Sequence, residues 1–252
     1  MKSQFKNLVV SGCSFTHEPD LGYSFSWANI LADWSGMNIY NLAVPGAGND
    51  HISKSVILYL ERNNLDPIET LILIMWSGVG RIDWITDKSL SNFENEYPFA
   101  YSYDQHNELV LGGNWWNDKN PTHLKHTLIE YSKYQSDYSM ALHSWLAMEN
   151  LSNYLENNKF THYYTSFLNY KMGNIKGDAM LVSFFDKLNE LNLTLNLDKW
   201  LKFGDDDYYG DWSRKHNFLA EDEFHPKYPA ANEGWVKQIL IPTLEDLKIL
   251  YE

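Results

Sequence analysis

An apolar run at residues 69–76 (ETLILIMW) constrains the fold more than any other segment of the chain. Its length and its unbroken apolar character are typical of a strand that is covered on both faces of a sheet. Two further strand-like runs precede it at residues 5–12 and 38–44, and segments with helical spacing at 24–34 and 50–65 separate the three. Strands that alternate with helices form parallel sheets, so the pattern predicts an α/β fold.

The regular alternation stops after residue 81. Residues 82–121 are polar, aromatic and rich in Asn and Asp. We expect them to form an insertion over the carboxyl edge of the sheet, where α/β proteins bind their ligands. Within this insertion, residues 99–103 and 108–111 are expected to pair as a hairpin. A long helix is predicted next, from residue 121 to about residue 157.

The last third of the chain completes the predicted architecture. We expect a fourth strand at 179–185 (AMLVSFF), a fifth at 191–197, a loop at 203–224, and a closing helix at 234–251 that Pro242 interrupts. With the earlier elements, this predicts a single domain over residues 1–252. The expected architecture is a three-layer α/β/α sandwich with a flavodoxin-like parallel sheet of about five strands.

The composition excludes several classes of protein. Hydrophobic residues make up 44% of the chain, and the net charge of −13 would repel a phosphate backbone, so no nucleic acid partner is expected. No apolar run approaches the roughly 20 residues that cross a bilayer, and the first apolar stretch is too short for a signal peptide. We therefore expect no membrane partner; the location is expected to be cytoplasmic, although the sequence leaves the compartment open. The single cysteine and the spacing of the histidines predict no disulfide, metal or cofactor.

A serine directly follows the first predicted strand, in Gly12-Cys13-Ser14-Phe15-Thr16. A side chain at this point emerges at the carboxyl end of the sheet, and a small residue before it lets the backbone turn sharply. Ser14 is therefore a candidate nucleophile, although Gly-x-Ser turns are also common without any catalytic role.

A second candidate motif, Asp222-Glu223-Phe224-His225-Pro226, lies near the other end of the chain. The spacing of three lets the Asp222 carboxylate reach Nδ1 of His225 and leaves Nε2 to accept a proton from a serine. The alternative is a solvated acidic loop with an incidental histidine.

The order of these motifs resembles the SGNH (GDSL-like) hydrolase family, whose first block holds the nucleophile and whose DxxH block holds the other two triad members. The segment Asn41-Leu42-Ala43-Val44-Pro45-Gly46 resembles the family's second block. The resemblance implies a triad of Ser14, His225 and Asp222. It also implies that the amides of Gly46 and Ser14 bind the oxyanion.

Two positions depart from the family pattern. Cys13 stands where the family usually has Asp, and we expect a small packed residue there. The third block, residues 76–81 (WSGVGR), lacks the usual Asn of the oxyanion hole. Ser77, Arg81 and Asn49 are candidates to replace that donor, with a helix cap as the alternative role for Asn49. Arg81 is also a candidate to bind an acidic substrate group or to pair with an acidic neighbour.

The resemblance implies a serine esterase that works through an acyl-enzyme on a small-molecule or carbohydrate ester, with an acetyl group on a carbohydrate preferred. Ten Trp and seventeen Tyr supply either a core of large rings or a sugar-binding surface, and Trp212 is a candidate substrate contact. The alternative class is a glycan-binding module on the same fold that is non-catalytic or only weakly active. The sequence predicts no oligomeric state.

Overall fold

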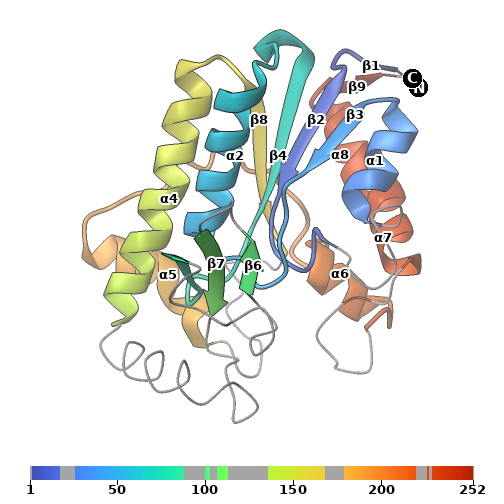
Figure 1. Ribbon diagram of the computed structural model, residues 1–252. Helices are drawn as coiled ribbons and strands as arrows, with labels where there is room; N and C mark the ends of the chain where they lie inside the picture. The colour runs from blue at the N-terminus through green and yellow to red at the C-terminus, as the bar shows by residue number, and fades with distance from the viewer. Residues whose placement is uncertain are drawn as a thin grey trace.

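The computed structural model describes residues 2–17, 26–87, 100–102, 107–112, 136–167, 179–219, 226 and 229–251. The asparagine- and aspartate-rich middle of the chain and the DxxH motif therefore lie largely or wholly outside the described residues. Figure 1 shows the arrangement of the helices and strands.

A parallel sheet of four strands, in the order β3-β2-β4-β8, forms the middle layer. Its strands are β2 (Asn7–Ser11), β3 (Asn38–Asn41), β4 (Thr70–Trp76) and β8 (Thr161–Ser166). In the register, Leu8 of β2 pairs with Ile39 on one side and Leu71 on the other. All seven residues of β4 are buried, because strands flank it on both sides and helices cover both faces. The three strands predicted first are confirmed, although β3 ends three residues early.

Helices cover both faces of the sheet, which confirms the predicted three-layer α/β fold (Figure 1). One layer holds α2 (Asn49–Asn63), α4 (Asp137–Asn157) and α5 (Ala179–Glu190). The opposite layer holds α1 (Trp27–Ser35), α7 (Ala230–Trp235), η5 (Val236–Leu240) and α8 (Ile241–Asp246). The short helices η2 (Pro67–Glu69) and α6 (Tyr209–Lys215) complete the described set. No helix in the described part of the chain is both long and apolar enough to cross a membrane.

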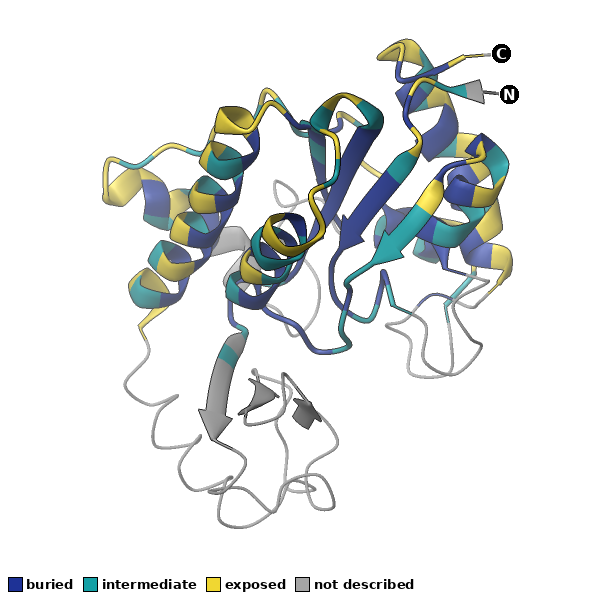
Figure 2. Cartoon of the chain, turned by 45° about the horizontal axis from the view of Figure 1, so that its top comes forward, coloured by how far each residue is buried: buried dark blue, intermediate teal, exposed yellow. Residues whose placement is uncertain are grey.

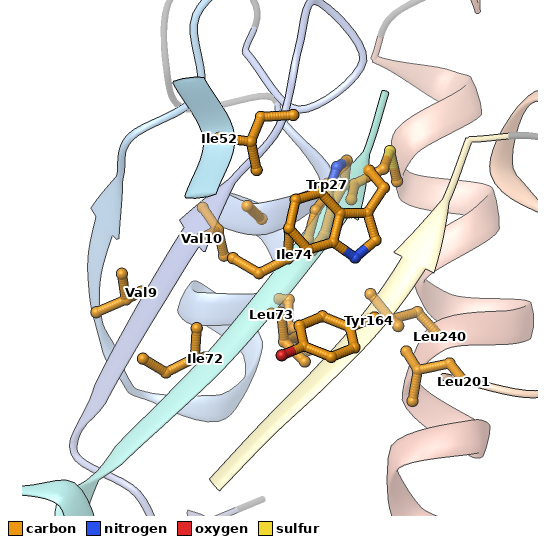
Figure 3. Packing of buried hydrophobic residues seen from close by; sticks show 14 of the residues in the cluster. Val9, Val10, Trp27, Ile52, Ile72, Leu73, Ile74, Tyr164, Leu201 and Leu240 are labelled. Atoms are coloured by element: carbon orange, nitrogen blue, oxygen red, sulfur yellow. The ribbon is translucent and has the colours of Figure 1, made fainter. Parts of the chain in front are cut away.

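The core lies between the sheet and these two layers. Figure 2 shows strands β2 and β4 largely buried, strand β3 at the edge of the sheet partly exposed, and the helices exposed on their outer sides. Figure 3 shows Val10 and Ile74 of the sheet packed with side chains from the helices, among them Trp27 of α1, Ile52 of α2 and Leu240 of η5. These side chains are almost fully buried, so the contacts supply the hydrophobic stabilisation that an α/β domain needs.

The predicted fourth strand at 179–185 is wrong, because these residues begin helix α5. The apolar run continues into Asp186-Lys187-Leu188, where Phe184 and Leu188 are buried one helical turn apart and Lys187 is bonded to Glu190. Residues such as Ala, Met and Leu also favour helix over strand. The sheet's fourth strand is instead β8, with the sequence THYYTS. Its polar residues hide it from a search for apolar runs.

The predicted fifth strand at 191–197 is also wrong. That segment is irregular, and among the described residues the fifth position of the sheet holds an isolated parallel bridge between Tyr164 and Trp200. The bridge rests on two backbone bonds, from Tyr164 N to Lys199 O (2.9 Å) and from Leu201 N to Tyr164 O (2.8 Å). The loop predicted after residue 203 contains the unexpected helix α6.

The closing helix starts at Ala230, earlier than predicted, and ends at Asp246. The predicted interruption at Pro242 takes the form of the π-helical turn η5 just before it. A proline cannot donate the amide bond of a regular helix, and a π turn changes the local bonding pattern without breaking the helix. Beyond the helix, β9 (Leu250–Tyr251) pairs antiparallel with β1 (Lys2–Ser3).

The segment after β4 forms a second, antiparallel sheet in the order β5-β7-β6. Its strands are β5 (Ile82–Asp87), β6 (Ala100–Ser102) and β7 (Asn107–Gly112). The pairing of β6 with β7 confirms the predicted hairpin, and β5 is an additional strand. The part of the predicted long helix before Ser136 lies outside the described residues, and α4 confirms the remainder.

Candidate active site

Ser14 lies in a tight turn directly after β2, at the carboxyl end of the parallel sheet. The amides of Thr16 and His17 both donate to the carbonyl of Cys13, at 2.9 Å and 3.0 Å. These bonds close the backbone around Ser14, which is half-buried. The turn therefore holds the Ser14 hydroxyl at the sheet edge where α/β proteins bind ligands.

The turn depends on the absence of a side chain at Gly12. A Cβ there would lie 2.3 Å from Oγ1 of Thr16 and 3.1 Å from the carbonyl oxygen of Met75. Cys13, next to it, is fully buried, so its thiol is packed in the core and is not placed to attack a substrate. The expectation of a packed small residue at this position is confirmed.

An aromatic stack fixes the far side of the same turn. The rings of Phe15 and Phe167 lie nearly parallel, 3.9 Å apart between centroids, and both are buried. Phe167 directly follows β8, and its carbonyl accepts from the amide of Gly210 in α6 at 2.7 Å. The stack therefore joins the Ser14 turn to the end of the strand that the sequence did not reveal.

A second turn, at Val44–Ala47, lies beside the first. The Ala47 amide donates to the Val44 carbonyl at 3.0 Å, Pro45 occupies the second position, and Gly46 has a left-handed φ of 84°. These are the features of a type II turn, in which glycine is favoured at the third position. Within the described part of the chain, no acceptor is found for the Gly46 amide.

Two hydrogen bonds hold the two turns together. The Val44 amide donates to the Gly12 carbonyl at 3.2 Å, and Nδ2 of Asn41 donates to the Thr16 carbonyl at 3.2 Å. Oδ1 of Asn41 also accepts from the Ala43 amide at 3.0 Å, which ends β3 and starts the loop. The structure thus brings the segments of Ser14 and Gly46 together, as the resemblance implied.

Asn49 does not have either of the roles considered for it. The cap of α2 is Gly48, and Asn49 is the first helical residue. Its Oδ1 accepts from the Ser77 amide at 2.9 Å, while Nδ2 donates to the Ser77 carbonyl and to Oγ of Ser144, both at 3.2 Å. Because a backbone amide can only donate, this pairing fixes the orientation of the side chain. Both Nδ2 hydrogens are used, so Asn49 is not available to an oxyanion.

The same pairing determines the role of Ser77 in the third block, residues 76–81. The Ser77 amide is already bonded to Asn49, and Ser77 is 1% exposed. Asn49 is 3% exposed and joins the start of α2 to the end of β4, while Ser144 links both to α4. A buried asparagine that satisfies a backbone amide and carbonyl together acts as a clamp between elements.

Arg81 lies at the start of the insertion and is bonded to the protein. Its Nη1 donates to the Ala47 carbonyl at 3.0 Å, and its charge lowers the pKa of Asp83. This supports the pairing with an acidic neighbour that the sequence left open. Binding of an acidic substrate group by Arg81 stays a prediction.

The structure reveals one charged residue that sequence reasoning missed. Asp83 accepts from the Gly48 amide at 2.7 Å and from the His51 amide at 2.9 Å, so one carboxylate caps the start of α2. Burial raises the pKa of Asp83 to about 6, against the lowering effect of these two bonds and of Arg81. The only available signal was a helix that starts after a glycine and so needs an acceptor from elsewhere.

Trp212 has a place in the core and not at a substrate surface. It is 1% exposed and stacks on His216, with centroids 4.3 Å apart, and on Phe218. A Cβ at Gly234 would lie 2.5 Å from its ring. We therefore do not retain Trp212 as a substrate contact.

The other two predicted triad residues, Asp222 and His225, lie outside the described residues. On either side of them, Leu219 and Pro226 form an isolated antiparallel bridge. Among the described residues, no group of three or more His, Cys, Asp or Glu side chains is placed to hold a metal ion.

The fold and these turns define this protein as a three-layer α/β/α sandwich with a serine turn after its first parallel strand and a glycine turn after the second. Solved structures with a similar fold align over almost the whole chain. TesA aligns with a TM-score of 0.51 and 11% identity, over 96% of this chain and 99% of that one. The psychrotrophic esterase EstA from Pseudoalteromonas sp. aligns with a TM-score of 0.50 and 11% identity, over 96% and 98%.

A member of the lipolytic G-D-S-L family from Veillonella parvula aligns with a TM-score of 0.50 and 10% identity, over 93% of this chain and 98% of that one. The chain therefore has the fold of the SGNH (GDSL-like) hydrolases, and the resemblance is confirmed at the level of the fold. No protein-family model matches the sequence, and the search of curated proteins finds no match.

Proposed function

We propose that the protein is a serine esterase of the SGNH type, with Ser14 as nucleophile, His225 as general base and Asp222 as the group that orients His225. One observation carries the proposal. The Ser14 turn and the Gly46 turn are bonded to each other through Gly12 and Val44 at the carboxyl edge of the sheet. The solved structures with this fold include one described as an esterase and one of a lipolytic family.

The proposed reaction proceeds in two acyl-transfer steps. Nε2 of His225 takes the proton of Ser14 Oγ as that oxygen bonds to the ester carbonyl carbon. The proton then passes to the leaving alcohol as the bond between the acyl carbon and the alcohol oxygen breaks. A water molecule, deprotonated by the same imidazole, then attacks the acyl carbon; the bond from that carbon to Ser14 Oγ breaks, the imidazole returns the proton to Oγ, and the acid is released.

The amides of Gly46 and Ser14 are the proposed oxyanion donors. Gly46 suits this role because its amide has no acceptor among the described residues and its turn lies against that of Ser14. Among the described residues, Asn49 and the Ser77 amide do not suit the role of the third donor, since they bind each other. Loss of one such donor costs about 10²–10³ in rate in measured enzymes, so we expect slow turnover.

The proposed substrates are small-molecule or carbohydrate esters, with an acetyl group on a carbohydrate preferred. The insertion at residues 82–121 is proposed to border the site, because β5 begins close to the end of β4 and Asp83 contacts the loop before α2.

The test is hydrolysis of p-nitrophenyl acetate by the wild type and by Ser14→Ala, His225→Gln and Asp222→Asn. We expect Ser14→Ala and His225→Gln to lower kcat by about 10⁶, to a small residual rate, and Asp222→Asn to lower it by about 10⁴. Ser152→Ala, on helix α4, serves as the control and should hydrolyse at the wild-type rate. A wild type that hydrolyses acetyl to octanoyl esters no faster than Ser14→Ala would refute the proposal and favour a binding module.

A further inference from the structure

The loop at residues 44–48, which we call the Gly46 loop, is held from two sides. On one side, the Val44 amide bonds to the Gly12 carbonyl of the Ser14 turn. On the other side, contacts come from residues after β4, which is two strands away from β3 in the sheet order. A loop with a left-handed residue and a proline has few internal bonds of its own, so these outside contacts determine its conformation.

Asp83 makes the central contact on the second side. Its Oδ1 accepts from the Gly48 amide at 2.7 Å, and its Oδ2 accepts from the His51 amide at 2.9 Å. The carboxylate approaches so closely that a Cβ at Gly48 would lie 2.5 Å from Oδ2. The absence of a side chain at Gly48 is therefore what allows Asp83 to reach the backbone.

Arg81, two residues before Asp83, contacts the preceding residue of the same loop through the bond from Nη1 to the Ala47 carbonyl. The two side chains thus bind the same peptide group, which joins Ala47 to Gly48: Arg81 donates to its carbonyl and Asp83 accepts from its amide. Together they bond to the residues that immediately follow Gly46 and limit how far its peptide can rotate.

The chemistry of the start of α2 explains why an acidic residue suits this position. The first amides of a helix have no partner within the helix, and the helix dipole favours a negative charge beside them. Asp83 uses two of these amides, at Gly48 and His51. Asp83 thus satisfies two of the first amides of α2, while the Gly46 amide, two residues before Gly48, has no acceptor among the described residues.

We propose that Asp83 is a positioning residue of the oxyanion site, which holds the Gly46 loop with its amide directed toward the carbonyl that Ser14 attacks. The proposal rests on the proposed esterase function. Asp83 itself touches no reacting atom and acts only through the Gly48 and His51 amides. Arg81 assists through the Ala47 carbonyl.

The kinetic test compares Asp83→Asn with Asp50→Asn, on p-nitrophenyl acetate. Asp50 is the acidic residue in the first turn of α2, but it is exposed and paired with Lys54, so it controls for the loss of a charge near the helix start. Rates are divided by the concentration of active sites, titrated with a p-nitrophenyl phosphonate that labels Ser14. We expect Asp83→Asn to lower kcat at least about tenfold with little change in KM, and Asp50→Asn to leave both unchanged.

A purely structural role would lower the fraction of sites that can be titrated and would leave kcat per site unchanged. That result for Asp83→Asn would overturn the proposal. Arg81→Gln provides a second variant in case Asp83→Asn does not fold. It should lower kcat per site in the same direction by a smaller factor, and an unchanged kcat for Arg81→Gln would also count against the proposal.

Hydrogen exchange separates this proposal from the esterase function itself. The amides of residues 46–51 should exchange faster in Asp83→Asn than in the wild type or in Asp50→Asn. If the wild type shows no Ser14-dependent turnover, the esterase function fails, and exchange alone decides whether Asp83 holds the loop. Unchanged exchange in Asp83→Asn would overturn the positioning role whatever the activity.

Discussion

The roles of single residues at the sheet edge depend on contacts with distant parts of the chain, which a sequence pattern does not show. Asn49 follows a glycine and opens a helix, and both observations favour a cap or an exposed donor. Its side chain is instead buried against the backbone of Ser77, at the end of β4. The two partners are 28 residues apart in the sequence, and they come within hydrogen-bond distance only when α2 packs beside β4.

Asn49→Ala should lower the free energy of unfolding by about 1–3 kcal/mol, because it leaves the amide and the carbonyl of Ser77 buried without their partner. Urea denaturation measures the change. Asn63→Ala serves as the control, since Asn63 is exposed at the other end of α2. Equal stability of the two variants would contradict the clamp.

Glycines at the ends of two neighbouring strands allow a matched comparison. A Cβ at Gly12 would lie 2.3 Å from Thr16 Oγ1 and 3.1 Å from the Met75 carbonyl oxygen, whereas a Cβ at Gly78 would meet nothing within 4 Å. We expect Gly12→Ala to cost about 1–3 kcal/mol of stability through overpacking and to displace the Ser14 turn. Gly78→Ala should be close to neutral. Thermal unfolding of both variants checks this, and a loss that is as large for Gly78→Ala would exclude the steric explanation.

At the scale of elements, helical spacing predicted helices α1 and α2, whereas apolar content alone did not predict element type. Helix α1 starts after Ser26, whose Oγ accepts from the Asn29 amide at 3.2 Å, and it ends at Gly36 in the left-handed region. By contrast, the apolar run at residues 179–185 was predicted to be a strand, whereas in the structure it begins helix α5. Short apolar runs do not distinguish the two, because the neighbours that an element packs against decide its type.

Ser26→Ala removes the side-chain cap of α1 and should lower the free energy of unfolding by about 1 kcal/mol. Chemical denaturation of the variant, beside Asn150→Ala at an exposed position within α4, provides the measurement. Asn150→Ala replaces a residue of low helix propensity by one of high propensity and should lose no stability. A loss in Asn150→Ala and none in Ser26→Ala would contradict the capping argument.

At the scale of the whole molecule, stability depends on pH through buried groups with opposite shifts. Burial lowers the pKa of His51 from 6.5 to about 4 and raises that of Asp83 from 3.8 to about 6. As the pH falls from 6.5 to 4, the unfolded chain protonates His51 before the folded protein does, so stability falls. Over nearly the same interval the folded protein protonates Asp83 first, so stability rises.

Removing one group should therefore reveal the effect of the other. With His51→Gln, we expect less loss of stability between pH 7 and pH 4.5, by up to about 3 kcal/mol. With Asp83→Asn, we expect a larger loss, because the opposing rise disappears. Urea denaturation at both pH values gives the two differences. Variants that both keep the pH dependence of the wild type would show that these groups do not control it.

The sequence alone determined the α/β class, the first three strands, helices α1 and α2, the hairpin of β6 and β7, and the segments of Ser14 and Gly46. These features depend on local patterns: unbroken apolar runs for strands with two neighbours, helical spacing, and turns that follow a strand. Each of them lies within a window of about fifteen residues, so no knowledge of distant contacts was needed.

Only the tertiary structure decided that β8 is the fourth strand, that residues 179–190 form a helix, and that Asp83 and Asn49 bind the backbone beside the Ser14 turn. An edge strand tolerates polar residues such as His162, because a polar group needs only a suitable partner, here the Phe160 carbonyl. Likewise, no sequence pattern marks a carboxylate, such as that of Asp83, that will bind backbone amides in the folded protein. Its role appears when folding brings it within hydrogen-bond distance of backbone amides that are more than thirty residues away in the sequence.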